Sequence, residues 1–356
     1  MHKRSIEKDG PRIRTAFTKQ DWPLLARLCR QALRKSKSDL TAHRLLGFSL
    51  NKQRKLSEAL KAYQQAIVFW PTDAELLINY GNVLIEHARN GDALPILEKV
   101  CKLLPNKAIC WLKLAECCYL LGLHNQGFDA SQTAAKLAET ARDHGTALKQ
   151  SAIHRRELGQ VQEAVRDCEA AIVLCPNDSG NYTNKLLFML ADPRTCAREL
   201  TAAARDFGSI FETPLIKNWP SFESYMKSPW RKLKVGFLSP DFRTHAVMYF
   251  VEGLLAQLDR RQFEVYAFYL YPQYDSATLR VQCHADHFVP LSGSTPEEQA
   301  NAIQAIGIDI LIDLAGHTGN NGLLAMARKP APVQVSTIGY PGTTGLQAID
   351  WWISDD

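Results

Sequence analysis

A set of small residues and prolines recurs every 34 residues in the first half of the chain, and this period restricts the fold more than any other feature. The recurring positions are Gly47, Ala59 and Pro71, then Gly81, Ala93 and Pro105, with Trp111, Leu114 and Ala115 next and, after a slip of three residues, Ala152, Ala164, Ala171 and Pro176. Small residues let two helices approach closely, and a proline ends the second helix of each pair. The period therefore predicts stacked antiparallel helix pairs, with breaks near the three prolines.

This period and these residue types are those of tetratricopeptide repeats, which stack into an α superhelix with a concave groove. We expect the repeat domain to span residues 1–190, with a helix pair around 13–35 and a closing helix around 182–190. Asn79, Gln150 and Asn184 fall at one position of their first helices, where their amides would bond the backbone of a bound peptide. The alternative is that they are solvated polar residues, which Leu45 and Lys113 at the equivalent position favour.

A connecting segment follows, and the period then changes. Residues 191–232 contain four prolines and one helical stretch at about 196–211, and Trp219 and Trp230 predict that this linker is packed rather than solvated. Short apolar runs then alternate with helical patterns through residues 233–356, which predicts a doubly wound parallel α/β lobe. The expected strands are 233–238, 263–270, 287–291, 309–316, 333–339 and 351–354.

Three strand ends carry polar or glycine-bearing loops, and parallel strands place such loops at one edge of the sheet. The first loop holds Asp241 and His245, the second His317 and Thr318, and the third runs from Gly339 to Gly345. His245 falls where a helix begins, and free backbone N–H groups there favour an anion. We expect a shared ligand crevice; the alternative is a set of well-capped connecting loops.

Composition excludes several classes of protein. The chain has no apolar run long enough to span a membrane, and we do not expect its short, basic N-terminus to be a signal peptide. Its net charge is only +5 and is spread along the chain, which disfavours a nucleic-acid role. Its nine cysteines lack metal-ligand spacing and predict free thiols in a reducing, cytoplasmic compartment, with no metal bound.

Three segments and the repeats before them resemble the nucleocytoplasmic protein O-glycosyltransferases, the O-GlcNAc transferase / SPINDLY family. The segments are LKVGFLSPDFRTHAVMYFVEGLLA, DILIDLAGHT and PAPVQVSTIGYPGTTG. The resemblance implies a Rossmann-like catalytic lobe over 233–356 and inverting, metal-independent transfer of a sugar from a nucleotide donor to Ser or Thr hydroxyls, without a further cofactor. The repeats would recruit the acceptor protein.

The resemblance also implies roles for individual residues. His245 matches the family's active-site histidine, and Asp241 matches an aspartate considered as a proton acceptor. The loop that approaches the donor sugar matches Gly339, Tyr340, Pro341, Gly342 and Thr343, and a loop at the same cleft matches His317 and Thr318.

Two departures from the family pattern change these expectations. Ala246 and Val247 follow the histidine where O-GlcNAc transferases have Pro-Thr, so the donor is UDP-GlcNAc or, as in some SPINDLY-like members, GDP-fucose. Residues 233–356 suffice for one lobe, whereas the family has two, so we expect a truncated chain that is inactive alone. The alternative function is a non-catalytic protein-binding scaffold.

Overall fold

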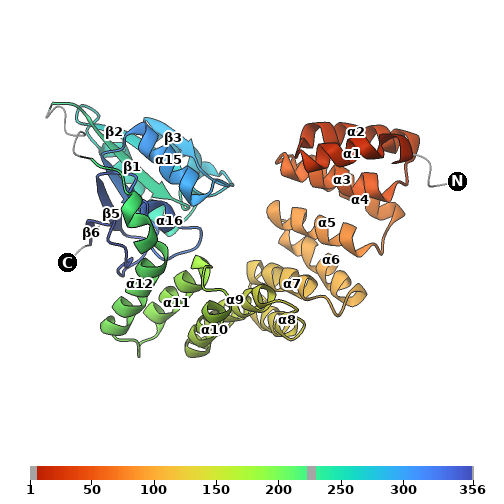
Figure 1. Ribbon diagram of the computed structural model, residues 1–356, viewed down its shortest axis with the longest axis horizontal. Coiled ribbons are helices and arrows are strands. Elements are labelled where there is room, and N and C mark those ends of the chain that lie inside the picture. The colour runs from red at the N-terminus through yellow and green to blue at the C-terminus, as the bar shows by residue number, and fades with distance from the viewer. Residues whose placement is uncertain (1–5, 223–229, 355–356) are drawn as a thin grey trace. The chain divides into compact units, whose positions relative to one another are not determined.

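The structure is a computed structural model that describes residues 6–222 and 230–354 (Figure 1). It divides into two compact units, Met1–Cys175 and Pro176–Asp356, and each is described by itself. The division falls before the boundary at residue 190 that the sequence predicted.

The first unit is a succession of antiparallel helix pairs. Their bounds are α1 (Ile6–Thr18), α2 (Trp22–Lys35), α3 (Leu40–Lys52), α4 (Leu56–Phe69), α5 (Ala74–Glu86), α6 (Asn90–Leu103), α7 (Ala108–Leu120), α8 (His124–Lys136), α9 (Ala141–Glu157) and α10 (Val161–Leu174). Residues 40–176, all of them described, contain no strand. The predicted repeat architecture is confirmed.

Glycines and prolines act in this unit as the period predicted. A Cβ atom on Gly47 of α3 would lie 2.3 Å from the buried ring of Tyr63 in α4, so this helix pair requires a glycine. Gly81 and Leu97 stand in the same relation between α5 and α6. The helices α4, α6 and α10 each end just before the prolines at 71, 105 and 176.

The second unit begins with helices and continues as an α/β lobe. Its helical elements are α11 (Ser179–Ala191), α12 (Ala197–Phe211), η1 (Thr213–Asn218), α13 (Ala246–Gln257), α14 (Ser276–His284), α15 (Pro296–Ile306) and α16 (Leu323–Met326). Its strands are β1 (Leu233–Ser239), β2 (Phe263–Tyr269), β3 (His287–Pro290), β4 (Ile310–Asp313), β5 (Val333–Thr337) and β6 (Trp351–Ile353). All six predicted strands are present.

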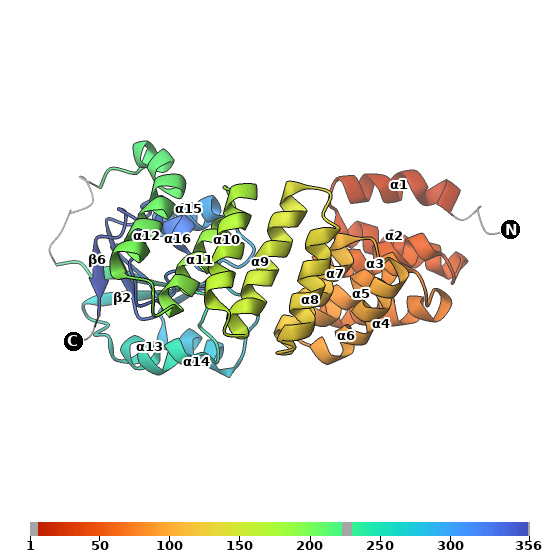
Figure 2. The same ribbon diagram turned by 90° about the horizontal axis from the view of Figure 1, so that it is seen from below.

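The strands form one parallel sheet in the order β3-β2-β1-β4-β5-β6, with a layer of helices on each face. Successive side chains of β1 point to opposite faces. Phe237 packs with Met248 and Val251 of α13, whereas Leu238 packs in the core that contains Ile303 of α15. Figure 2 shows α13 and α14 on one side of the sheet and α15 and α16 on the other.

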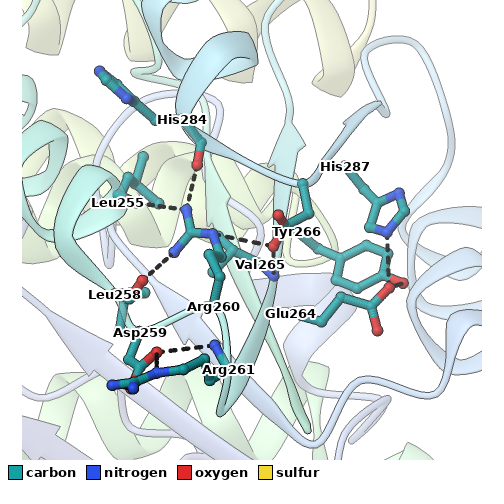
Figure 3. Close-up of polar contacts among 11 residues, drawn as sticks. Leu255, Leu258, Asp259, Arg260, Arg261, Glu264, Val265, Tyr266, His284 and His287 are labelled. Carbon is teal, nitrogen blue, oxygen red and sulfur yellow. Dashed lines mark hydrogen bonds and ion pairs between the residues drawn. The ribbon is translucent and has the colours of Figure 1, made fainter.

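The guanidinium of Arg260 lies at the end of the sheet where β2 begins (Figure 3). Arg260 donates hydrogen bonds to the carbonyls of Leu255 and Leu258 at 2.7 and 2.8 Å and to that of His284, and it pairs with Asp286 at 3.2 Å. It thereby satisfies carbonyls at the ends of α13 and α14. The loops that carry the candidate site lie at the opposite end of the strands.

The segment before β1 is packed on the second unit. Tyr182 of α11 contacts the rings of Phe207 and Phe211 in α12, and the indole of Trp219 donates to the carbonyl of Ala327 at 2.9 Å. These contacts explain why α11 belongs to the second unit. The prediction for Trp230 is wrong, because this residue is 93% exposed, and residues 223–229 of the expected linker lie outside the described residues. Within 6–222 and 230–354, none of the helices is long and apolar enough to cross a bilayer.

We expect the substitution Gly47→Ala to destabilise the first unit by about 1–3 kcal/mol, because the new methyl group overlaps the ring of Tyr63. The matched control is Gly91→Ala in α6, where a Cβ atom meets nothing within 4 Å. This control should raise stability by up to about 1 kcal/mol, because alanine favours helix over glycine. Denaturant unfolding monitored by circular dichroism measures both, and equal effects would contradict the packing argument.

Candidate functional site

The three polar loops lie at one edge of the sheet, as predicted. β1 pairs in parallel with β4, and β4 with β5, so the loops after these strands emerge side by side. The chain order reverses at β1, which pairs with β2 on its other side. Ligands of open α/β sheets bind outside the carboxyl ends of the strands at such a reversal. The loops after β1 and β4 flank it.

The loop after β1 brings an aspartate and a histidine together. Asp241 is buried, and its backbone N–H donates to Ser239 Oγ at 2.9 Å. His245 is the N-cap of α13, as the sequence predicted, and its side chain is 38% exposed. The distance from His245 Nδ1 to Asp241 Oδ2 is 3.8 Å. The structure therefore places a buried carboxylate behind a solvent-accessible imidazole.

Two groups compete for the same ring nitrogen of His245. The backbone N–H of Val247 donates to Nδ1 at 3.3 Å, which requires the tautomer with its hydrogen on Nε2. An imidazole that accepts a proton on Nε2 instead carries its hydrogen on Nδ1, which faces Asp241. A carboxylate in this position favours the tautomer with its hydrogen on Nδ1, as the carboxylate of a catalytic triad does.

Two further residues fix this loop, and the sequence analysis did not identify them. Arg243 donates to the other carboxylate oxygen of Asp241 at 3.3 Å, and its guanidinium lies 4.9 Å from the ring centre of Tyr271. Asp275 caps α14 and accepts from the backbone N–H of Thr244 at 2.6 Å. Burial acts to raise the pKa of Asp275, but hydrogen bonds from Thr244, Thr278 and Ala277 outweigh burial and lower its pKa to about 2. The sequence does not distinguish Arg243 or Asp275 from other charged residues in loops.

His317, in the loop after β4, is fully buried. Its Nε2 donates to the carbonyl of Thr344 at 2.9 Å, and Nδ1 lies 3.5 Å from the hydroxyl of Thr183 in α11. The ring also packs edge-on against Phe207 at 4.7 Å and Tyr340 at 5.4 Å between centroids. Burial lowers the pKa of His317 to about 4, although the bond to Thr344 partly offsets it. The side chain is therefore neutral and enclosed.

The loop after β5 is held closely against the loop after β4. A Cβ atom on Gly339 would lie 2.0 Å from the carbonyl oxygen of Leu314, and one on Gly316 would lie 2.4 Å from Tyr340 Cβ. Tyr340 is buried, with its hydroxyl 3.5 Å from the carbonyl of Leu186 in α11. Gly316 and Gly339 are thus required because the two loops lie too close together for a side chain at either position. The glycines in these loops were visible in the sequence.

Beneath these two loops lies a buried carboxylate that the sequence analysis missed. Asp313 accepts from the backbone N–H groups of Ala315 and Gly316, at 3.1 and 2.9 Å, and from the hydroxyl of Ser336 at 2.8 Å. Burial raises its pKa, and these three hydrogen bonds offset part of the rise.

The predicted substrate-binding residues therefore divide into two groups. Pro341 and Thr343 are exposed, and Gly342 and Thr318 are half-buried. The side chains of His317 and Tyr340 are enclosed by α11, α12 and each other, so they support the loops from behind. In the described part of the chain, no group of three or more His, Cys, Asp or Glu residues is arranged to hold a metal ion.

In the first unit, Asn79 lines a hollow of about 250 Å³ together with Asn51, Asn82, Lys113 and Glu116. The side-chain oxygens of Asn51 and Asn82 are buried there without a hydrogen-bond partner. The sequence analysis missed these two asparagines because it followed only the position of Asn79. Gln150 is half-buried on α9, and Asn184 lies on α11 of the second unit.

A parallel sheet in this strand order defines a Rossmann-type fold. Comparison with known proteins makes the assignment specific. Residues 208–356 match the model of glycosyl transferase family 41. The second unit therefore contains a region that is similar to the domains of this glycosyltransferase family.

Two plant proteins are similar to part of the chain. The chain is 36% identical over 184 residues to the probable UDP-N-acetylglucosamine–peptide N-acetylglucosaminyltransferase SPINDLY of Arabidopsis thaliana, a match that covers 51% of the chain and 20% of the relative. Its identity to the SEC protein of the same plant is 29% over 161 residues, covering 45% and 16%. The chain thus spans about a fifth of the length of these relatives.

The fold resembles a mutant O-GlcNAc transferase of Thermobaculum terrenum with a TM-score of 0.60 and 24% identity, covering 89% of this chain and 54% of that one. A tetratricopeptide repeat protein of Parabacteroides merdae gives a TM-score of 0.51 at 17% identity, covering 58% and 80%. Both likenesses support the fold.

We expect the second unit to lose stability as the pH falls from about 6.5 to about 4, in part through His317. The folded state keeps this imidazole neutral down to a pKa of about 4, whereas the unfolded chain binds a proton near 6.5. The contribution is complete above pH 6.5 and is lost progressively below it. His317→Gln retains a donor for Thr344 but removes the titration.

The measurement compares denaturant midpoints of wild type and His317→Gln between pH 4 and 7, so that other titrating groups cancel. His287→Gln, at an exposed position of β3, is the control. A difference between wild type and His317→Gln that does not vary with pH would contradict a buried neutral histidine.

Proposed function

We propose that this chain provides the acceptor-side part of a protein O-glycosyltransferase. The sugar comes from a nucleotide donor, UDP-GlcNAc or GDP-fucose, and goes to Ser or Thr hydroxyls, without a further cofactor. The observation that carries the proposal is the pair Asp241 and His245 at the sheet reversal of a family 41 domain. Free thiols at all nine cysteines support a reducing, cytoplasmic setting.

In the proposed reaction the acceptor hydroxyl attacks the anomeric carbon of the donor in one displacement. The bond from that carbon to the diphosphate breaks, and the nucleoside diphosphate leaves with the electron pair. His245 Nε2 takes the hydroxyl proton, and Asp241 stabilises the resulting imidazolium. The loop around Gly342 lies close to the sugar because it lacks bulk. The polypeptide would supply donors to the departing diphosphate, where negative charge develops.

The repeat unit is proposed to bind the acceptor polypeptide. The hollow lined by Asn51, Asn79 and Asn82 contains two amide oxygens without partners. Such oxygens accept hydrogen bonds from the backbone N–H groups of an extended peptide, and this contact is independent of the peptide's side chains.

We expect His245→Ala and Asp241→Asn each to lower transfer at least about a hundredfold, because the first removes the base and the second favours the wrong tautomer. The assay uses the natural gene product that contains this sequence, with radiolabelled UDP-GlcNAc or GDP-fucose and a pool of Ser/Thr peptides. Asp259→Asn, at the opposite edge of the sheet, is the matched control and should transfer like wild type.

Activity that survives in both variants would contradict the roles of the two residues. Peptide binding without any transfer by the wild-type protein would favour the alternative, a non-catalytic scaffold.

We expect the double substitution Asn51→Ala and Asn82→Ala to weaken binding of acceptor peptides roughly tenfold or more, because two buried hydrogen bonds are lost. Fluorescence anisotropy with labelled peptides measures the change in the 356-residue chain. Gln65→Ala on the exposed face of α4 is the control. Unchanged affinity in the double variant would show that acceptors bind elsewhere.

A further inference from the structure

Helix α12 presents one face to the loop that follows Gly342. Ala204, Gly208 and Glu212 recur every four residues and so share a face. A Cβ atom on Gly208 would lie 2.2 Å from the carbonyl oxygen of Gly345, and one on Gly345 would lie 1.8 Å from that of Ala204. The helix and the loop therefore meet backbone to backbone.

At the end of this face, the side chain of Glu212 binds the backbone of the loop. Its Oε2 accepts from the backbone N–H of Gln347 and its Oε1 from that of Ala348, both at 2.7 Å. The side chain is fully buried, and burial raises its pKa although these two hydrogen bonds and the charge of Lys329 act against the rise. A carboxylate with two acceptors matches two adjacent N–H groups, which a neutral amide cannot do.

The other end of the same loop is strained. Ile338 has a φ of +61°, which β-branched residues rarely adopt and which costs about 1–2 kcal/mol. Ile338 is also 43% exposed, so burial of its side chain does not account for the conformation. Such a conformation persists only where the surrounding structure fixes the chain. Gly339 against Leu314 fixes one side of the loop, and Glu212 fixes the other.

From these contacts we propose that Glu212 is a positioning residue for sugar transfer. It holds residues 345–348 against α12 and thereby sets where Pro341, Gly342 and Thr343 stand beside His245. The proposal rests on the proposed function, because it assigns the purpose of the loop from that activity. Its consequence is that a residue outside the sheet controls how the donor sugar is placed.

The test compares Glu212→Gln with Glu199→Gln. Glu199 caps the other end of the same helix, where its carboxylate accepts from the backbone N–H of Cys196 at 2.9 Å. Both variants therefore remove a negative charge from an end of α12, but only Glu212 contacts the loop. Transfer kinetics are measured in the natural gene product at a temperature at which both variants are fully folded.

For Glu212→Gln we expect kcat/KM for the donor to fall roughly ten- to a hundredfold, because a small displacement of the sugar is costly. The KM for the acceptor peptide should change less than twofold, and Glu199→Gln should match wild type in both. Glu212→Asp keeps the charge and both acceptors, so it should recover part of the loss, and it replaces Glu212→Gln if that variant does not fold. Equal donor kinetics in the Glu199 and Glu212 variants would overturn the proposal.

A second measurement separates this proposal from the proposed function. Hydrogen exchange of the Gln347 and Ala348 amides in the 356-residue chain should accelerate about tenfold or more in Glu212→Gln and stay unchanged in Glu199→Gln. Accelerated exchange with no transfer by wild type would mean that the proposed function fails while Glu212 still fixes the loop. Unchanged exchange would overturn the positioning role itself.

Discussion

The candidate site depends on the contact between the backbone of α12 and the backbone at Gly345. Neither Gly208 nor Gly345 leaves space for a side chain, so helix and loop are fixed at the closest possible separation. The match to glycosyl transferase family 41 begins at residue 208, inside α12 and well before β1. Both facts indicate that the end of α12 belongs to the region that matches family 41 rather than to a connection before it.

Two histidines at the same sheet edge have opposite physical states. His245 is partly exposed, with a carboxylate 3.8 Å from one ring nitrogen. His317 is enclosed by Phe207, Tyr340 and a carbonyl, and burial keeps it neutral. The two histidines both follow a strand in the sequence, so the sequence does not distinguish them. They differ in how much of each ring the surrounding residues bury.

The local parts of this structure were predictable from the sequence, and the long-range parts were not. Period and prolines indicated the helix pairs, and apolar runs indicated all six strands, because these signals act within one element. The helix α11 carries the apolar pattern of a repeat, but the pattern does not say that Tyr182 packs on α12 or that Thr183 meets His317. The contact between Thr183 and His317 joins residues 134 positions apart, and such contacts decide which predicted site residues are buried.

Buried polar groups at this edge oppose one another in their dependence on pH. His317 has a lowered pKa, so its contribution to stability is lost as the pH falls below about 6.5. Asp313 and Glu212 have raised pKa values, so the folded state favours their protonated forms, and stability is lost as the pH rises above their ordinary values near 4. The two effects have opposite signs across mildly acidic pH. Because a buried histidine and buried carboxyl groups occur together here, the stability of the second unit varies less with pH than it would with either kind of group alone.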